Sequence, residues 1–202
     1  MHLSVTEIVH DLVRPHLRPG DTALDGTAGN GHDALFLARC VGPAGRVFAW
    51  DLQPLAIDRT AALLAKHGVT WVESILGDHA DLDRTSVSPP LSAAMFNLGY
   101  LPASDRSIVT SAASSVRAIR AALGFLRPGG IVTVLAYTGH PGGAEEAEAI
   151  RDLLTSQPSA EYEFREVTIP AGRTAPPKLF ALVRHPLPES AIPNLRPGGE
   201  SP

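Results

Sequence analysis

The stretch that decides the fold runs from Asp21 to Asp33 and reads DTALDGTAGNGHD. Its first part, Thr22–Asp25, is short, largely apolar and followed by glycines, which predicts a buried strand that ends in a tight turn. The apolar residues after the turn recur at helical spacing and predict a helix. Gly29 and Gly31 permit positive φ angles and the close approach of a ligand to the backbone. Because a helix N-terminus offers free N–H groups and a partial positive charge, we expect a ligand site here.

An acidic residue, Asp51, ends the next predicted strand, twenty residues beyond Gly31. In a doubly wound α/β sheet this position holds the ribose of a nucleoside. A dinucleotide fingerprint has the spacing Gly-x-Gly-x-x-Gly, whereas the glycines here stand at 26, 29 and 31 after Asp25, so a nicotinamide dinucleotide fits poorly. The pattern resembles motif I of class I S-adenosylmethionine (SAM) methyltransferases, with Thr27 in place of the first of two alternating glycines. An ordinary tight turn without a ligand is the alternative.

The composition indicates one α/β domain with a full core. The chain has 202 residues, 44% of them hydrophobic, and a mean hydropathy of +0.05. No apolar run approaches the roughly 18 residues that a membrane span needs, and no signal peptide is evident at the N-terminus, so we expect a cytoplasmic protein with no membrane partner. The net charge of −4 argues against bulk nucleic-acid binding, so an RNA contact must come from a local patch. We predict no metal site, and the single cysteine, Cys40, excludes an intramolecular disulfide.

Strands and helices alternate along the chain. We predict helices over residues 4–16, 32–41, 54–67, 105–126 and 144–156, and strands over residues 22–25, 46–51, 69–76, 91–97, 131–137, 162–169 and 178–184. A sharp turn is predicted at 127–130. This order predicts a Rossmann-like α/β fold, with a seven-stranded, mostly parallel sheet and helices on both faces. The domain is expected to cover 1–184, and 185–202, rich in Pro and Gly, to be a disordered tail.

Parallel strands have their carboxyl ends at one edge of the sheet, so the loops after the first five strands meet at one rim. Ligands of such sheets bind at this rim. Asp78 and His79 lie in the loop after the third strand, where an acidic residue commonly contacts the amino group of an adenine. A solvated loop aspartate is the alternative. The predicted cofactor-binding residues of the rim are Asp25, Thr27, Gly29, Asn30, Gly31, Asp33, Asp51, Gln53, Asp78, His79 and Asn97.

The loop after the fourth strand reads Asn97-Leu-Gly-Tyr100-Leu-Pro102. It is similar to the Asn-Pro-Pro-Tyr loop of methyltransferases that act on exocyclic amines. The Asn97 Oδ1 and a nearby carbonyl can accept the two N–H bonds of a neutral amine, which aims the amine lone pair at a sulfonium methyl group. Tyr100 can stack on a flat base. As alternatives, the asparagine could cap a turn and the tyrosine could only pack.

Several segments together resemble the bacterial family labelled "putative rRNA methylases", over about residues 3–184. They are DGTAGNG from Asp25, WDLQ ending at Gln53, GDH ending at His79, MFNLGYLP ending at Pro102, YTGHPGG ending at Gly143, and Pro176-Pro177. The resemblance implies SAM as cofactor and, since members are implicated in methylating the aminomethyl group of wobble uridine, a tRNA substrate. Two departures are Ala34, where threonine is usual, and Arg173-Thr-Ala, where an asparagine is expected. The second concerns substrate contacts more than cofactor binding.

Methylation of an alkylamine requires the uncharged amine. An amine with a pKa of about 10.4 is neutral in about one molecule per two thousand at pH 7, so a proton acceptor is expected. His140, in the glycine-flanked loop after the fifth strand, is the candidate for that role or for substrate alignment. An exposed loop histidine is the alternative. The predicted catalytic residues are therefore Asn97, Tyr100 and His140.

The main prediction is a SAM-dependent RNA methyltransferase that acts on tRNA. The alternatives are a methyltransferase for rRNA or for a small-molecule amine, and a non-catalytic nucleoside- or RNA-binding module. The intact Asn97–Tyr100 segment argues against the last. A homodimer could lengthen the surface that contacts RNA. The basic residues considered for that surface are Arg106, Arg117, Arg120, Arg127, Arg165, Arg173 and Lys178.

Overall fold

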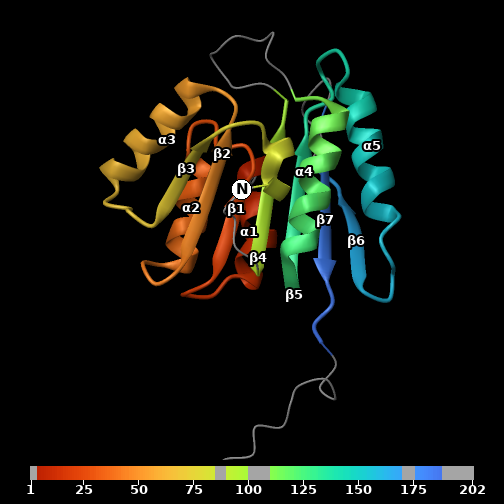
Figure 1. The fold of residues 1–202 in the computed structure, drawn as a ribbon. Coiled ribbons are helices and arrows are strands. Elements are labelled where there is room, and N and C mark those ends of the chain that lie inside the picture. Colours follow the sequence, from red (N-terminus) through yellow and green to blue (C-terminus); the bar gives the residue numbers. More distant parts are fainter. Residues whose placement is uncertain (1–3, 85–89, 100–109, 170–175, 188–202) are drawn as a thin grey trace, which may run out of the picture.

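The computed structural model describes residues 4–84, 90–99, 110–169 and 176–187 (Figure 1). The helices are α1 (Val5–Val13), α2 (His32–Val41), α3 (Pro54–Lys66), α4 (Ala112–Phe125) and α5 (Gly143–Thr155), with two 3-10 segments, η1 (Arg14–His16) and η2 (His79–Arg84). The strands are β1 (Thr22–Asp25), β2 (Arg46–Asp51), β3 (Val72–Leu76), β4 (Leu91–Leu98), β5 (Leu126–Ala136), β6 (Tyr162–Val167) and β7 (Lys178–Arg184).

The strands form a seven-stranded sheet with the order β3-β2-β1-β4-β5-β7-β6. The pairs among β1 to β5 are parallel, and β7 runs antiparallel to both β5 and β6, as its reversed arrow in Figure 1 shows. The predicted fold class is confirmed. Because the first five strands are parallel, the loops that follow them all lie at one edge of the sheet.

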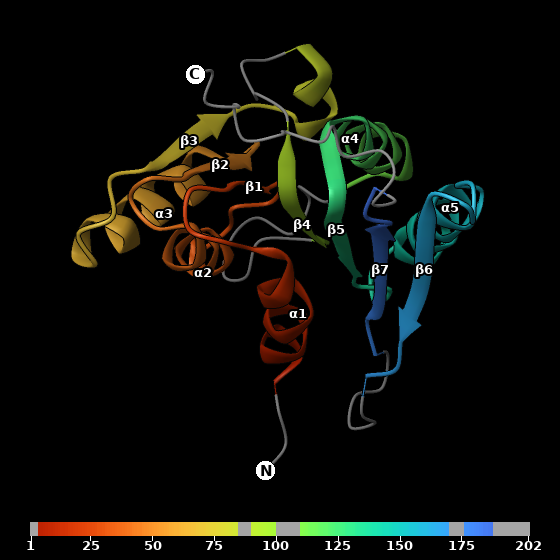
Figure 2. The same cartoon turned by 90° about the horizontal axis from the view of Figure 1, so that it is seen from below.

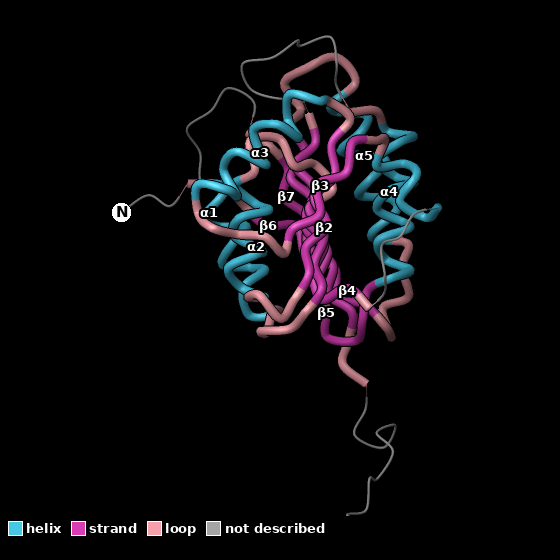
Figure 3. The backbone as a smooth tube through the Cα atoms, turned by 60° about the vertical axis from the view of Figure 1, so that its left-hand side comes forward, coloured by secondary structure: helices cyan, strands magenta, loops and turns pink. Residues whose placement is uncertain are grey.

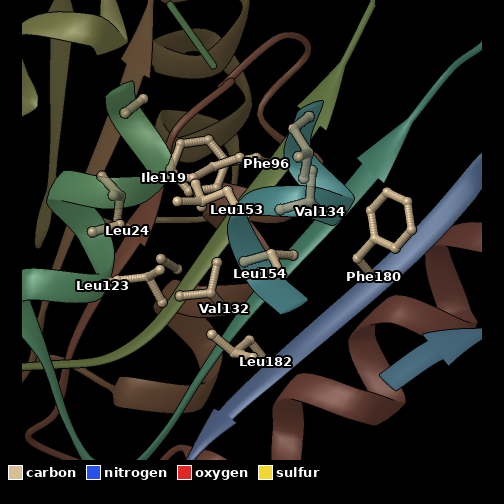
Figure 4. Packing of buried hydrophobic residues seen from close by; sticks show 14 of the residues in the cluster. Leu24, Phe96, Ile119, Leu123, Val132, Val134, Leu153, Leu154, Phe180 and Leu182 are labelled. Carbon is tan, nitrogen blue, oxygen red and sulfur yellow. The ribbon is translucent and has the colours of Figure 1, made fainter. Parts of the chain in front are cut away.

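Helices cover both faces of the sheet. Helices α1, α2 and α3 lie on one side, and α4 and α5 on the other (Figures 2 and 3). Along each strand the side chains alternate between the two cores, as a strand geometry requires. Thus Ala23 and Met95 pack toward α1 and α2, whereas their neighbours Leu24 and Phe96 pack toward α4 and α5. Figure 4 shows the second of these cores, where side chains of α4 and α5 meet those of β5 and β7.

Strand β5 differs most from its predicted form. The turn expected at 127–130 lies inside the strand as a bulge, because Leu126 pairs with Leu91 and the next pair is Ile131 with Ala93. The chain does leave the ladder at the Pro-Gly-Gly sequence, and Gly129 has a φ of 76°. The prediction that the strand begins only at Ile131 is wrong, because pairing with β4 resumes on both sides of the bulge.

Other element boundaries shift by a few residues. Strand β3 begins at Val72 rather than at 69, and η2 forms where a loop was expected. Helix α4 begins at Ala112, behind a capping box of Ser111 and Ser114, and the first part of the predicted helix, 105–109, lies outside the described residues. The same holds for residues 188–202 of the predicted tail. No helix within the described ranges has the length and apolar character needed to span a bilayer.

Candidate functional site

The turn after β1 is fastened to the strands on both sides of it. The Gly26 N–H donates to the Met95 carbonyl of β4 at 2.8 Å, and the Ala28 N–H donates to the Trp50 carbonyl of β2 at 2.7 Å. These bonds hold the turn at the carboxyl edge, across the line where the sheet order reverses. The predicted ligand turn is therefore a fixed part of the sheet edge.

Two glycines of this turn are required by packing. A Cβ on Gly26 would lie 2.2 Å from the Phe96 ring, and a Cβ on Gly31 would lie 2.9 Å from the Thr60 Cα of α3. Gly31 also has a φ of 82° as the residue before α2. The sequence predicts a role in ligand approach and a positive φ for Gly31, and gives Gly26 only a place in the glycine pattern. The structure adds that they let the turn sit against β4 and let α2 begin against α3.

Asp51 lies at the end of β2. Its carboxylate bonds both the turn after β1 and the turn after β2, and these two turns together are called the cradle. Its Oδ2 accepts from the Gly29 N–H at 2.9 Å, and its Oδ1 accepts from the Gln53 N–H at 2.9 Å. A carboxylate can accept about four hydrogen bonds. Asp51 therefore keeps the capacity to accept bonds from two further hydroxyl groups, such as those of a ribose.

Asp25 is fully buried at the inner end of the turn. Its Oδ1 accepts from the Thr27 N–H at 3.1 Å, but its Oδ2 is buried without a hydrogen-bond partner in the described structure. Burial, and then the charge of Asp33, raise the pKa of Asp25 well above its usual value, and the backbone N–H groups of Thr27 and Ala34 oppose this. An acceptor that is buried and unpaired fits a site whose ligand brings a donor group.

Asn97 is held by two hydrogen bonds to residues outside its own strand. Its backbone N–H donates to the Thr27 Oγ1 at 2.7 Å, and its side-chain Nδ2 donates to the Asp33 Oδ2. The other oxygen of Asp33, Oδ1, lies 2.6 Å from the His10 Nε2. Thr27 and Asp33 were predicted to bind cofactor, and here they position Asn97. His10 was missed, because a residue of α1 has no fixed spacing from the motifs that it meets in the fold.

The remaining predicted cofactor residues have different surroundings. The Asn30 Oδ1 accepts from Arg59 at 3.1 Å. Asp78 is exposed, and its Oδ1 accepts from the Ala80 N–H at 2.8 Å, which starts η2. His79 packs edge-on against Phe96 with ring centroids 6.3 Å apart. Burial lowers the pKa of His79, against the opposing charge of Asp78.

His140 lies in the loop between β5 and α5. Its Nδ1 is 3.0 Å from the Pro141 carbonyl, which can only accept, so Nδ1 is the donor and, in the neutral ring, Nε2 carries the lone pair. Nε2 is buried and has no hydrogen-bond partner in the described structure. Among the described contacts, none joins His140 to Asn97. Tyr100, the third predicted catalytic residue, lies outside the described residues.

A buried carboxylate that was not predicted fixes the chain after β4. Glu146 of α5 is 1% exposed and accepts from the Thr110 Oγ1 at 2.8 Å and from the Ser115 Oγ at 2.6 Å. The Thr110 N–H also donates to the Gly99 carbonyl at 3.1 Å. The two ends of the segment that begins just after Asn97 are therefore joined. Nothing in the sequence distinguishes Glu146 from the neighbouring acidic residues of α5.

The basic residues considered for RNA binding are not gathered on one face by the described structure. Arg117 pairs with Asp81 and Asp83, and Arg165 pairs with Glu163. Lys178 lies 3.5 Å from Glu166, and Arg127 is 3.4 Å from Asp21 at the opposite edge of the sheet. Arg120 is exposed, and Arg106 and Arg173 lie outside the described residues.

The residues of this edge fit a SAM nucleoside. The hydroxyl groups of the ribose need hydrogen-bond acceptors, and the Asp51 carboxylate supplies them. The ammonium group in the methionine part of SAM also needs an acceptor, and the unpaired Oδ2 of Asp25 is one. An exposed carboxylate at Asp78 is available to the amino group of an adenine. Within the described residues, no group of three His, Cys, Asp or Glu side chains could hold a metal ion.

Comparison with known proteins places the chain in a family. The family model described as "Putative rRNA methylase" matches residues 47–183. The chain is similar to the Arabidopsis thaliana protein named "tRNA (mnm(5)s(2)U34)-methyltransferase, chloroplastic", with 34% identity over 167 residues, which are 78% of this chain. The chain spans 61% of the length of that relative.

Two solved structures have nearly the same extent as this chain. The structure of a Clostridium thermocellum protein named "putative rRNA-methylase" has a TM-score of 0.86 and 34% identity, and the match covers 91% of this chain and 99% of the other. The structure of a Streptococcus mutans protein named "a putative methyltransferase", in complex with SAH, has a TM-score of 0.82 and 29% identity, and the match covers 91% of this chain and 99% of the other.

Proposed function

The chain belongs to the family described as "Putative rRNA methylase", and from this premise we propose that it is a SAM-dependent RNA methyltransferase that methylates the aminomethyl group of a modified wobble uridine in tRNA. The Arabidopsis relative is named for methylation of this kind of tRNA nucleoside. The chain spans 61% of the length of that relative. The substrate proposed for this chain is supported by the geometry around Asn97, the proposed amine site.

The single observation that carries the proposal is the orientation of the Asn97 amide. Its Nδ2 is committed to the carboxylate of Asp33, and its backbone N–H is committed to Thr27. No donor among the described residues reaches its Oδ1. Asn97 therefore presents an acceptor, which suits the N–H bonds of a neutral amine and leaves the amine lone pair for reaction.

The cofactor would be held by the cradle after β1 and β2. Asp51 would accept the ribose hydroxyls, the buried oxygen of Asp25 would accept from the amino group, and Asp78 would accept from the adenine. When bound, SAM supplies a methyl group that its sulfonium charge activates. The turn at Gly29 lets the backbone approach the ligand, since no Cβ stands in the way.

His140 is proposed as the proton acceptor. An amine with a pKa of about 10.4 must lose a proton at a cost of about 4 to 5 kcal/mol at pH 7. Because Nδ1 of His140 donates to Pro141, the neutral ring has its lone pair on Nε2, which has no hydrogen-bond partner in the described structure. Tyr100 is proposed to stack on the base, as its place three residues after Asn97 suggests.

The substrate class is tested by methyl transfer in vitro. The purified protein is given SAM with a tritiated methyl group and, separately, tRNA from a strain that lacks the modification, rRNA from the same strain, and a pool of small amines. We expect label in tRNA and, on nucleoside mass spectrometry, conversion of an aminomethyluridine to its N-methylated form. Label confined to rRNA or to the small amines would replace the proposed substrate. Binding of SAM without transfer would indicate a non-catalytic module.

Two finer proposals accompany this function. We propose a cytoplasmic location, because no signal peptide is evident in the sequence, and fractionation of cells would test it. We also propose a homodimer that lengthens the RNA-binding surface. Sedimentation equilibrium measures the mass in solution, and a mass near the 21.3 kDa of one chain would exclude the dimer.

A further inference from the structure

Three polar side chains from three different elements form a row behind the proposed amine site. His10 of α1 lies 2.6 Å, through Nε2, from the Oδ1 of Asp33 at the start of α2. The other oxygen of Asp33 accepts from the Nδ2 of Asn97 at the end of β4. The side chains of His10 and Asp33 are 17% and 10% exposed, so water competes little for these bonds.

We propose that His10 is a positioning residue for methyl transfer, which acts through Asp33 to hold the Asn97 amide with its oxygen toward the substrate. This inference rests on the proposed function and deepens it. His10 lies 87 positions before Asn97 and belongs to none of the motifs of the rim. Its role follows from the fold, which places α1 beside α2 on one face of the sheet (Figure 3).

Asp33 decides which way the amide of Asn97 faces. The two ends of an amide have nearly the same shape but opposite hydrogen-bonding properties. A carboxylate oxygen accepts a bond from the NH2 end and repels the oxygen end. If Asp33 turned away, the amide could rotate and present its NH2 group to the substrate amine, where two donors would face each other.

His10 in turn decides where Asp33 points. Its ring is stacked on Phe36 of α2, with centroids 3.8 Å apart and planes 5° apart. The guanidinium of Arg14, the first residue after α1, lies 5.1 Å from the centre of the same Phe36 ring. Packing against Phe36 therefore fixes the orientation of the His10 ring independently of its bond to Asp33. Without it, one oxygen of Asp33 would lose its bond, and the carboxylate could adopt other rotamers.

The test compares two substitutions that differ in where they place an N–H donor. The amide nitrogen of glutamine can occupy the place of the histidine Nε2, whereas that of asparagine is too short to reach it. We expect His10→Asn to lower kcat for the methyl acceptor by about tenfold, because small errors in the placement of reacting groups are costly. His10→Gln should restore most of kcat. The KM for SAM should change less than about twofold in both variants, since a positioning role affects the transition state.

Two further variants complete the design. Asp11→Asn, on the exposed side of α1, is the control for effects on the helix itself and should leave kcat unchanged. In the double variant His10→Asn with Asn97→Ala, the loss should equal that of Asn97→Ala alone, because residues that act through one another are not additive. Equal kcat for wild type and His10→Asn, or full additivity, would overturn the inference.

A second readout does not depend on activity. The side-chain NH2 of Asn97 gives a pair of signals in a nitrogen-15 NMR spectrum, assigned with the Asn97→Ala variant. We expect these signals to shift in His10→Asn and to return in His10→Gln. Unchanged signals in His10→Asn would contradict the inference even if the protein methylates no RNA. A shift without any RNA methylation would retain the positioning role and reject the proposed substrate.

Discussion

At the scale of the residue, the proposed chemistry depends on which polar atoms of the site already have hydrogen-bond partners within the protein. The motifs of the sequence predict Asn97 and Asp51, because each is the polar residue that ends a strand of the rim. They do not reveal that Asp33 is bonded to Asn97 and to His10. They also miss the buried Glu146. Such partners come from distant segments, and only the folded chain brings them together.

Replacement of Asn97 by aspartate tests its role as a fixed acceptor. The side chain keeps its shape, but the NH2 group that Asp33 binds becomes an oxygen. Two carboxylates would then face each other, and we expect kcat to fall by about a hundredfold or more, as for other misplaced contacts of reacting groups. Calorimetry should find SAM affinity within about threefold of wild type. Retained kcat would show that the amide is not needed.

The buried Asp25 is predicted to lower the stability of the protein at neutral pH. Its folded-state pKa is raised above the ordinary 3.8, so the folded state binds a proton more tightly than the unfolded state. The free energy of unfolding therefore falls as the pH rises from about 3.8 through the folded-state pKa. Asp25→Asn removes this dependence, and we expect a higher melting temperature at pH 7 together with weaker SAM binding.

The control for this prediction is Asp11→Asn, which neutralises an exposed aspartate of α1. It should change the melting temperature little at pH 7. Thermal melts between pH 4 and pH 8 give both curves. If Asp25→Asn and wild type lost stability in parallel over this range, the buried carboxyl would not be the group that titrates.

At the scale of the element, the sequence predicts most of the sheet. Helix α2 and strands β1, β2 and β7 have the predicted bounds, because each is a regular apolar run between clear stop signals. Strand β5 does not, because Pro-Gly-Gly is a turn signal that a bulge can also use. The Arg127 Nε bonds the Ser92 Oγ at 2.7 Å, and its guanidinium bonds the His16 carbonyl at 2.9 Å, which stabilise that bulge.

The start of α2 depends on a glycine that no other residue can replace without strain. In Gly31→Ala the new Cβ would lie 2.9 Å from the Thr60 Cα, and the residue would keep a φ of 82°. We expect a loss of about 1 to 3 kcal/mol in the free energy of unfolding. Urea denaturation measures it.

Substitutions at two other glycines separate the cost of the positive φ from the cost of the contact with Thr60. Gly42 has a φ of 65° with nothing within 4 Å of an added Cβ, so Gly42→Ala isolates the cost of the backbone angle. Gly124 lies exposed in α4 with open space around it, and Gly124→Ala should stabilise by about 0.5 to 1 kcal/mol. A loss for Gly31→Ala no greater than that for Gly42→Ala would show that the contact with Thr60 is unimportant.

At the scale of the whole molecule, the apolar core residues and the polar residues of the site lie in different parts of the fold. Two apolar cores fill the spaces between the sheet and its helices, and the polar groups of the site lie at the carboxyl edge. The order of strands and helices was enough to predict this division, since parallel strands bring their following loops to one rim. The charge pattern was not enough to predict an RNA surface, because pairing of Arg117 or Arg165 with carboxylates depends on the fold.

The domain is predicted to end with β7. This strand pairs with β5 as far as Val183 and with β6 as far as Arg184, and the sheet gains no further strand from the described residues. We therefore expect a chain truncated after Leu187 to melt within about 1 °C of the full chain and to bind SAM equally well. Differential scanning calorimetry checks the melting temperature. A drop of several degrees would place residues 188–202 in the domain.

The central claim is that the carboxyl edge, between the turn at Gly29 and Asp51, is a site for a SAM nucleoside. Isothermal titration calorimetry of the purified protein tests it most directly, with SAM and NAD as titrants and Asp51→Ala as the matched variant. The account predicts binding of SAM, none of NAD, and at least about tenfold weaker binding of SAM by the variant, because the ribose would lose charged acceptors. Binding of NAD in place of SAM would contradict it.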